Sequence, residues 1–149
     1  MENLDSLYQW LDGEGVFLFD RQLPFSKDDS KATTIKLKPP NEVWGIFLDK
    51  GRLKTMSEEK SALLHESGHY ATGTTHEVCS PCDLISKHEY KADKWGIQRA
   101  LSAEELDWAV ADGHTDLWDL ADYFGVTEDF MRKAVCWYTH GNLATELYF

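Results

Sequence analysis

The chain is poor in features that mark several protein classes. Its 149 residues include three cysteines and four prolines, and its 15 basic side chains face 26 acidic ones. A small, odd number of cysteines argues against a disulfide framework and for reduced thiols. No apolar run approaches the roughly 20 residues of a membrane span. We therefore expect no membrane association.

The net charge of -11 would repel a polyanion, so we expect no nucleic-acid partner. The first residues lack the basic region and apolar stretch of a secretory signal, which favours a cytoplasmic protein. Hydrophobic residues make up 42% of the chain and aromatic residues 13%, enough for a real core. The length predicts a single domain over residues 1–149.

Hydrophobic periodicity predicts strands early in the chain and helices later. After a short helix that begins at Leu4, strands are expected at residues 16–20, 33–38, 43–49 and 52–56, with a hairpin turn at residues 50–51. A helix is expected at residues 58–72, with Thr55 and Glu58 as its capping box and Gly73 as its stop. Another is expected at residues 86–101, and three more after the capping residues Ser102 (with Glu105), Thr115 and Thr127. This order indicates an α+β fold in which a small, mainly antiparallel sheet precedes a helical half.

The second predicted helix carries the pattern HExxH, formed by His65, Glu66 and His69. Residues four apart share a helix face, so both imidazoles can reach one zinc ion. Glu66 lies one residue along, where its carboxylate can act as general base toward the attacking water. Chance alone would produce this pattern in about 2% of such sequences, so it is moderately specific.

A second motif on the next helix strengthens the zinc interpretation. Glu89 follows His69 by 20 residues and completes a His, His, Glu ligand set of the gluzincin kind for one Zn²⁺ per chain. Asp93, one turn further, can accept a hydrogen bond from the outer nitrogen of a liganding histidine. His76 and His88 are alternative third ligands, and the plainest alternative is two surface histidines on an amphipathic helix.

These motifs resemble the ImmA/IrrE group of small zinc metallo-endopeptidases of phages, mobile elements and bacterial chromosomes. The resemblance spans residues 43–138 and rests on four segments, Gly45–Asp49, Leu64–Tyr70, Glu89–Gly96 and Leu120–Val126. It implies that His65, His69 and Glu89 are the ligands, that Glu66 is the catalytic acid/base, and that the substrate is a helix-turn-helix repressor encoded nearby. The chain departs from the family at Gly96, where alanine is common, and at Ser102, where proline is common.

Several other residues invite functional interpretations. Tyr70 and His114 are candidates for stabilising the oxyanion or contacting substrate, although packing and loop roles are simpler. A structural zinc site at His76, Cys79, Cys82 and His88 matches no standard spacing, so reduced thiols are expected.

Residues 120–135 have the rhythm of a helix-turn-helix, but Glu128 and Asp129 stand where bases would be read, which favours a packed helical hairpin. The alternative to an enzyme is a catalytically silent zinc-binding sensor or interaction protein on the same fold.

Overall fold

The computed structural model describes residues 1–22, 31–37, 42–75 and 82–143. A helix, α1 (Leu4–Gly13), comes first, followed by three strands, β1 (Phe17–Asp20), β2 (Ala32–Leu37) and β3 (Val43–Leu48). Five helices complete the order: α2 (Met56–Thr72), α3 (Cys82–Ala100), α4 (Ala103–Ala111), α5 (Leu117–Phe124) and α6 (Glu128–His140). The α+β class predicted from the sequence is confirmed.

The sheet is mixed rather than mainly antiparallel. Its strand order is β1-β3-β2, in which β1 pairs with β3 in parallel and β2 pairs with β3 antiparallel. The prediction of a mainly antiparallel sheet was therefore wrong. Alternation of side chains has the same period in both pairings, so the sequence pattern cannot distinguish them.

The fourth predicted strand, residues 52–56, is absent from the described fold. The backbone N–H groups of Arg52 and Leu53 both donate to the Asp49 carbonyl, which makes a turn, and Thr55 then caps α2. The turn and the start of α2 occupy the segment in which the alternating apolar pattern predicted a strand. The N-cap expected at Thr115 is also displaced by one residue, to Asp116.

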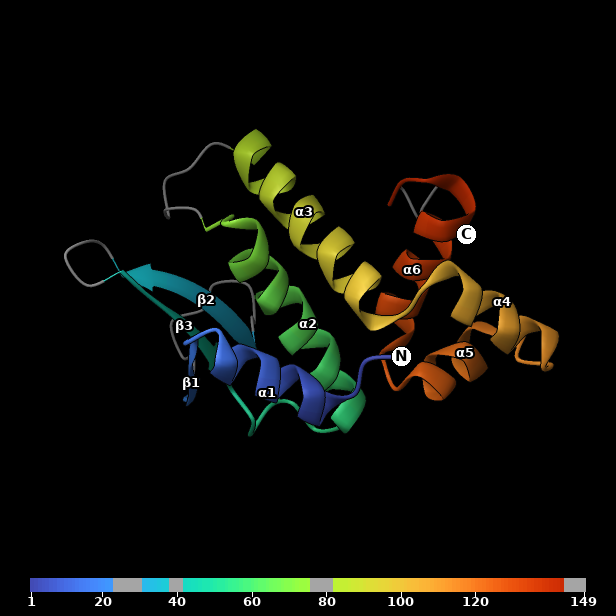
Figure 1. Cartoon of the computed structure of the whole chain (residues 1–149), viewed down its shortest axis with the longest axis horizontal. Coiled ribbons are helices and arrows are strands. Elements are labelled where there is room, and N and C mark those ends of the chain that lie inside the picture. Colours follow the sequence, from blue (N-terminus) through green and yellow to red (C-terminus); the bar gives the residue numbers. More distant parts are fainter. Residues whose placement is uncertain (23–30, 38–41, 76–81, 144–149) are drawn as a thin grey trace.

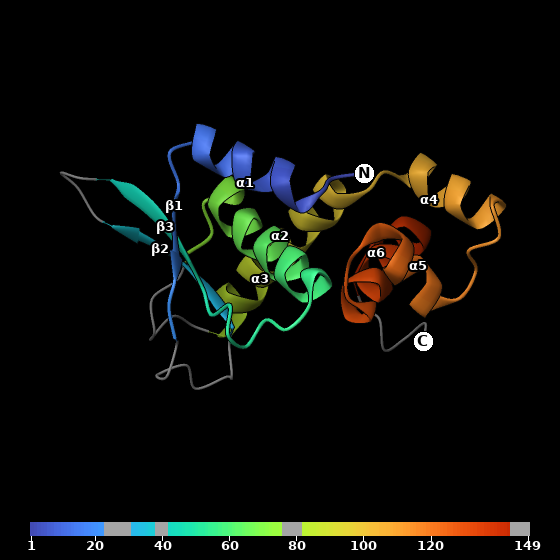
Figure 2. The same cartoon turned by 90° about the horizontal axis from the view of Figure 1, so that it is seen from below.

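The two longest helices, α2 and α3, lie side by side. The sheet lies at one end of the molecule and α4, α5 and α6 lie at the other (Figure 1, Figure 2). The core runs between them and includes fully buried side chains from α1, β3, α2, α3 and α6, among them Leu7, Ile46, Leu63, Ile97 and Met131. No described helix combines the length and apolar character needed to cross a bilayer.

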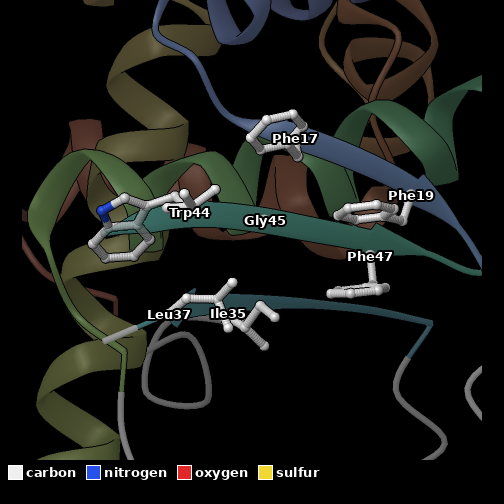
Figure 3. Close-up of a pocket in the computed structure, with 8 residues that line it drawn as sticks. Phe17, Phe19, Ile35, Leu37, Trp44, Gly45 and Phe47 are labelled. Atoms are coloured by element: carbon white, nitrogen blue, oxygen red, sulfur yellow. The ribbon is translucent and has the colours of Figure 1, made fainter. Parts of the chain in front are cut away.

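One face of the sheet packs on α2, and the other is apolar and open. On the open face Phe17 is 56% exposed and Leu37 53% exposed. The rings of Phe19 and Phe47 stack there with centroids 4.7 Å apart. Together with neighbouring side chains these residues line a hollow of about 310 Å³ (Figure 3).

Candidate metal centre

Helix α2 carries the HExxH residues, and both of its ends are capped. The Thr55 side chain accepts a hydrogen bond from the Glu58 N–H at the N-terminus. At the C-terminus Gly73 adopts φ 65°, a left-handed conformation that glycine reaches without steric cost. Both caps agree with the sequence-based expectation. Within this helix His65 and His69 lie one turn apart on the side facing α3.

The two histidines and Glu89 converge on one point. The Nε2 atoms of His65 and His69 are 3.2 Å apart. The Glu89 carboxylate lies 2.7 Å from His65 Nε2 and 3.2 Å from His69 Nε2. The ligating atoms of these three residues all lie within 4.8 Å of one another, so the cluster could hold a metal ion.

Hydrogen bonds to the outer ring nitrogens orient both imidazoles. His65 Nδ1 lies 2.7 Å from Asp93 Oδ1, and His69 Nδ1 lies 2.9 Å from the Thr74 carbonyl oxygen. Since a carbonyl and a carboxylate only accept hydrogen bonds, each Nδ1 carries a hydrogen. In the neutral rings both Nε2 lone pairs therefore point into the space shared with Glu89, an arrangement that requires a proton or a cation between them.

The electrostatics of the cluster favour a positive charge at this position. Burial acts to lower the pKa of His65, but hydrogen bonds to Asp93 and Glu89 outweigh it and raise that pKa to about 10. Burial would raise the pKa of Glu89, yet its hydrogen bonds to His65 and His69 hold the pKa far below its usual range.

The donor set is one that could hold a zinc ion. Ligands at 2.0–2.1 Å from a tetrahedral zinc ion lie about 3.3 Å from one another. The Nε2 atoms of His65 and His69, 3.2 Å apart, match this edge, and Glu89 reaches His65 with Oε2 and His69 with Oε1. Imidazole nitrogens and a carboxylate oxygen are also ordinary zinc ligands.

Close packing of α2 on α3 brings Glu89 to the histidines. Gly68 faces the backbone of Ala92, where a Cβ on residue 68 would meet the Ala92 carbonyl oxygen at 2.3 Å. One turn along α3, a Cβ on Gly96 would meet the Leu64 carbonyl oxygen at 3.2 Å. These two glycines let the helix backbones approach each other at the level of the site.

Glu66 is nearly buried, with 7% of the residue exposed. Burial is the main cause that raises the pKa of its carboxyl group, against the lowering influence of His65 and His69. The hydroxyl of Thr34, on the edge strand β2, donates to Glu66 Oε2 at 2.9 Å. A carboxylate in this setting is suited to hold and release a proton.

Asp93 links the site to the last described helix. Its Oδ2 atom lies 3.3 Å from Lys133 Nζ on α6, while Oδ1 bonds to His65. The hydrogen bond to His65 and the charge of Lys133 lower the pKa of Asp93, outweighing burial. The predicted contact of Asp93 with a histidine of the HExxH motif is therefore present, and Asp93 is itself anchored by Lys133.

Tyr70 and His114 are not drawn into the cluster. The Tyr70 ring makes edge contacts with Trp10 and Trp44, and its hydroxyl donates to Glu14 at the end of α1. His114 lies between α4 and α5, at the end of the molecule opposite the sheet, and its Nδ1 bonds to Asp119 (Figure 1). The structure assigns packing contacts to both.

The remaining candidates are separate from the site or lie outside the described residues. His76 and Cys79 fall in residues 76–81, which the structure does not describe. The structural zinc site considered at His76, Cys79, Cys82 and His88 therefore lies partly outside the described residues. His88 is not a member of the metal-binding cluster found among the described residues.

Residues 120–135, whose spacing resembles a helix-turn-helix, form a packed helical hairpin. Helices α5 and α6 are joined at Gly125, and Phe124 and Met131 are buried between the helices and the core. The ammonium group of Lys60 on α2 donates to the Phe124 carbonyl at 2.7 Å and holds the turn in place. Glu128 and Asp129 are exposed at the start of α6.

Sequence reasoning missed three residues that support the site, Thr34, Thr74 and Lys133. Thr74 follows the glycine that ends α2, so a search for polar residues just after the HExxH helix could have found it. No pattern in the sequence marks Thr34 or Lys133, because their contacts join segments 32 and 40 residues apart.

Comparisons with protein-family models, with curated proteins and with solved structures give no match for this chain. The functional interpretation rests on the site's own chemistry and on the motifs described above.

Proposed function

We propose that the protein is a zinc-dependent endopeptidase that hydrolyses a peptide bond in a protein partner. The observation that carries this proposal is the convergence of two histidine Nε2 atoms and the Glu89 carboxylate beside the buried Glu66. A metal-binding cluster alone would suit storage or structure, whereas an adjacent carboxylate placed one residue from a ligand suits hydrolysis.

His65, His69 and Glu89 would hold the zinc ion, which when bound supplies a Lewis acid that polarises the scissile carbonyl and the attacking water. Glu66 takes a proton from that water and delivers it to the leaving amine. Asp93 and Thr74 keep the two imidazoles in the ligating tautomer through their Nδ1 hydrogens. The raised pKa of Glu66 favours this two-way proton transfer.

The edge strand β2 is the natural place for the substrate. Among the described strands it pairs with β3 alone, along one side, and Thr34 brings it against Glu66. An extended peptide that pairs with the free side of this strand gains backbone hydrogen bonds and passes beside the site. Substrates would therefore be segments able to adopt an extended conformation.

The partner suggested by the resemblance to the ImmA/IrrE group is a helix-turn-helix repressor encoded nearby. A DNA-binding repressor carries basic surface, and this chain has a net charge of -11. Long-range attraction would speed their encounter and weaken in salt.

The decisive experiment compares wild type with Glu66→Gln. Both proteins, loaded with zinc, are mixed with the repressor from the neighbouring gene, and fragments are followed by mass spectrometry. Glu66→Gln should retain zinc and fold but cut at least 1000-fold more slowly, because an amide cannot accept the proton. Equal cutting by both would exclude Glu66 as the base. Binding without cutting by wild type would instead support the zinc-binding sensor.

A further inference from the structure

The general base of the proposed reaction is anchored by a residue of the sheet rather than by its own helix. Thr34 lies in β2, opposite Ile46 of β3 in the antiparallel register. Its side chain projects from the covered face of the sheet and reaches Glu66, where Oγ1 lies 2.9 Å from Oε2 and 3.1 Å from the Glu66 carbonyl oxygen.

The threonine hydroxyl has one hydrogen to give, and of the two Glu66 acceptors in reach the side-chain Oε2 is nearer than the backbone carbonyl oxygen. The donor to the Glu66 carboxylate thus comes from a strand 32 residues earlier in the chain and not from α2. A hydrogen bond to a charged group in a buried place is stronger than an ordinary one. The bond holds Oε2, so proton transfer in the proposed reaction would use Oε1.

We propose that Thr34 is the positioning residue for Glu66 and ties the general base to the strand that receives substrate. This inference rests on the proposed function. Because β2 supplies both the hydroxyl that holds Glu66 and the free edge for an added strand, the register of the bound peptide is fixed relative to the base. Thr34 acts through Glu66 and does not itself touch the reacting atoms.

Three variants test the role of Thr34. Thr34→Val keeps the shape of the side chain and removes the hydroxyl, and Thr34→Ser restores the hydroxyl. Thr33→Val is the matched control, since Thr33 is exposed and occupies the opposite face of the same strand, opposite Phe47. All three should bind zinc like wild type, because none of them alters a ligand.

The first readout is structural and independent of any substrate. Crystal structures of the zinc-loaded proteins should show the Glu66 carboxylate rotated away from its wild-type position in Thr34→Val, and in place in Thr34→Ser and Thr33→Val. An unmoved, equally ordered Glu66 carboxylate in Thr34→Val would overturn the proposal.

The second readout is turnover of the repressor that wild type cleaves. Thr34→Val should lower kcat by about 10- to 100-fold with KM changed less than about twofold, and Thr34→Ser should recover most of kcat. A change confined to KM, or no rescue by serine, would overturn the positioning role. If wild type cuts nothing, the proposed function fails, and the crystal structures still decide whether Thr34 holds Glu66.

Discussion

Gly68 and Ala92 touch through their backbones, so that a Cβ on residue 68 would lie 2.3 Å from the Ala92 carbonyl oxygen. Real side chains do not approach a backbone oxygen so closely, and the contact therefore requires glycine. Gly68 lies between the two histidines in sequence, and Ala92 immediately precedes Asp93. The distance between α2 and α3, and with it the reach of Glu89, depends on this contact.

Gly68→Ala should push α3 away from α2. We expect a loss of about 1–3 kcal/mol in the free energy of unfolding, even though alanine favours a helix over glycine by about 1 kcal/mol. Zinc affinity should fall as well, because Glu89 is displaced. Gly13→Ala is the control, since nothing lies within 4 Å of a Cβ there. Denaturant unfolding and chelator competition check both effects.

Replacing any one ligand should abolish stoichiometric metal binding. Wild type is expected to bind about one zinc per chain, and His65→Ala, His69→Ala or Glu89→Ala should each lose most of it. His114→Ala serves as a histidine control and should bind like wild type. Elemental analysis of the purified proteins measures the content. Full zinc in Glu89→Ala would move the third ligand elsewhere, His76 and His88 being the alternatives.

Asp93→Ala should weaken zinc binding without removing a ligand. Loss of the carboxylate that holds His65 Nδ1 is expected to cost about 10- to 100-fold in affinity. Lys133→Met, which removes the ion pair to the other Asp93 oxygen, should have a smaller effect in the same direction. Competition with a zinc-chelating dye measures both. An Asp93→Ala protein indistinguishable from wild type would make the contact dispensable.

Lys60 should leave a signature in the pH dependence of stability. Burial lowers the pKa of Lys60 below its usual value of 10.5, so between the two values the unfolded chain binds a proton that the folded chain does not. Unfolding is then harder at higher pH. The free energy of unfolding of wild type relative to Lys60→Met should therefore rise with pH as 10.5 is approached from below. Urea titrations at several pH values test this, and a constant difference would show that the pKa of Lys60 is the same in both states.

Local patterns in the sequence predicted the helices and the grouping of His65, His69 and Glu89. Thr55, Gly73 and Thr127 cap their helices as expected, and Ser102 with Glu105 forms the expected capping box. These features depend on residues three or four apart, which a sequence displays directly. The three proposed ligands follow from the same kind of spacing, together with one inference about the next helix.

Contacts between distant segments were not predictable in this way. The parallel pairing of β1 with β3 joins strands that β2 separates in sequence. The alternation of side chains along a strand does not indicate which other strand it pairs with. Residues 52–56 have a strand-like pattern, but the turn at Asp49 and the cap at Thr55 overrode it. The hydrogen bond from Thr34 to Glu66 depends on where the sheet meets α2, which only the packed structure defines.

The open face of the sheet affects how variants of this protein should be compared. Phe17 and Leu37 are more than half exposed beside the stacked rings of Phe19 and Phe47. Dyes that fluoresce on apolar surfaces will bind this face in the native state, although such binding is commonly taken as a sign of partial unfolding. Thermal scans with these dyes will start from a high background. The intrinsic fluorescence of the six tryptophans is the better measure of melting here.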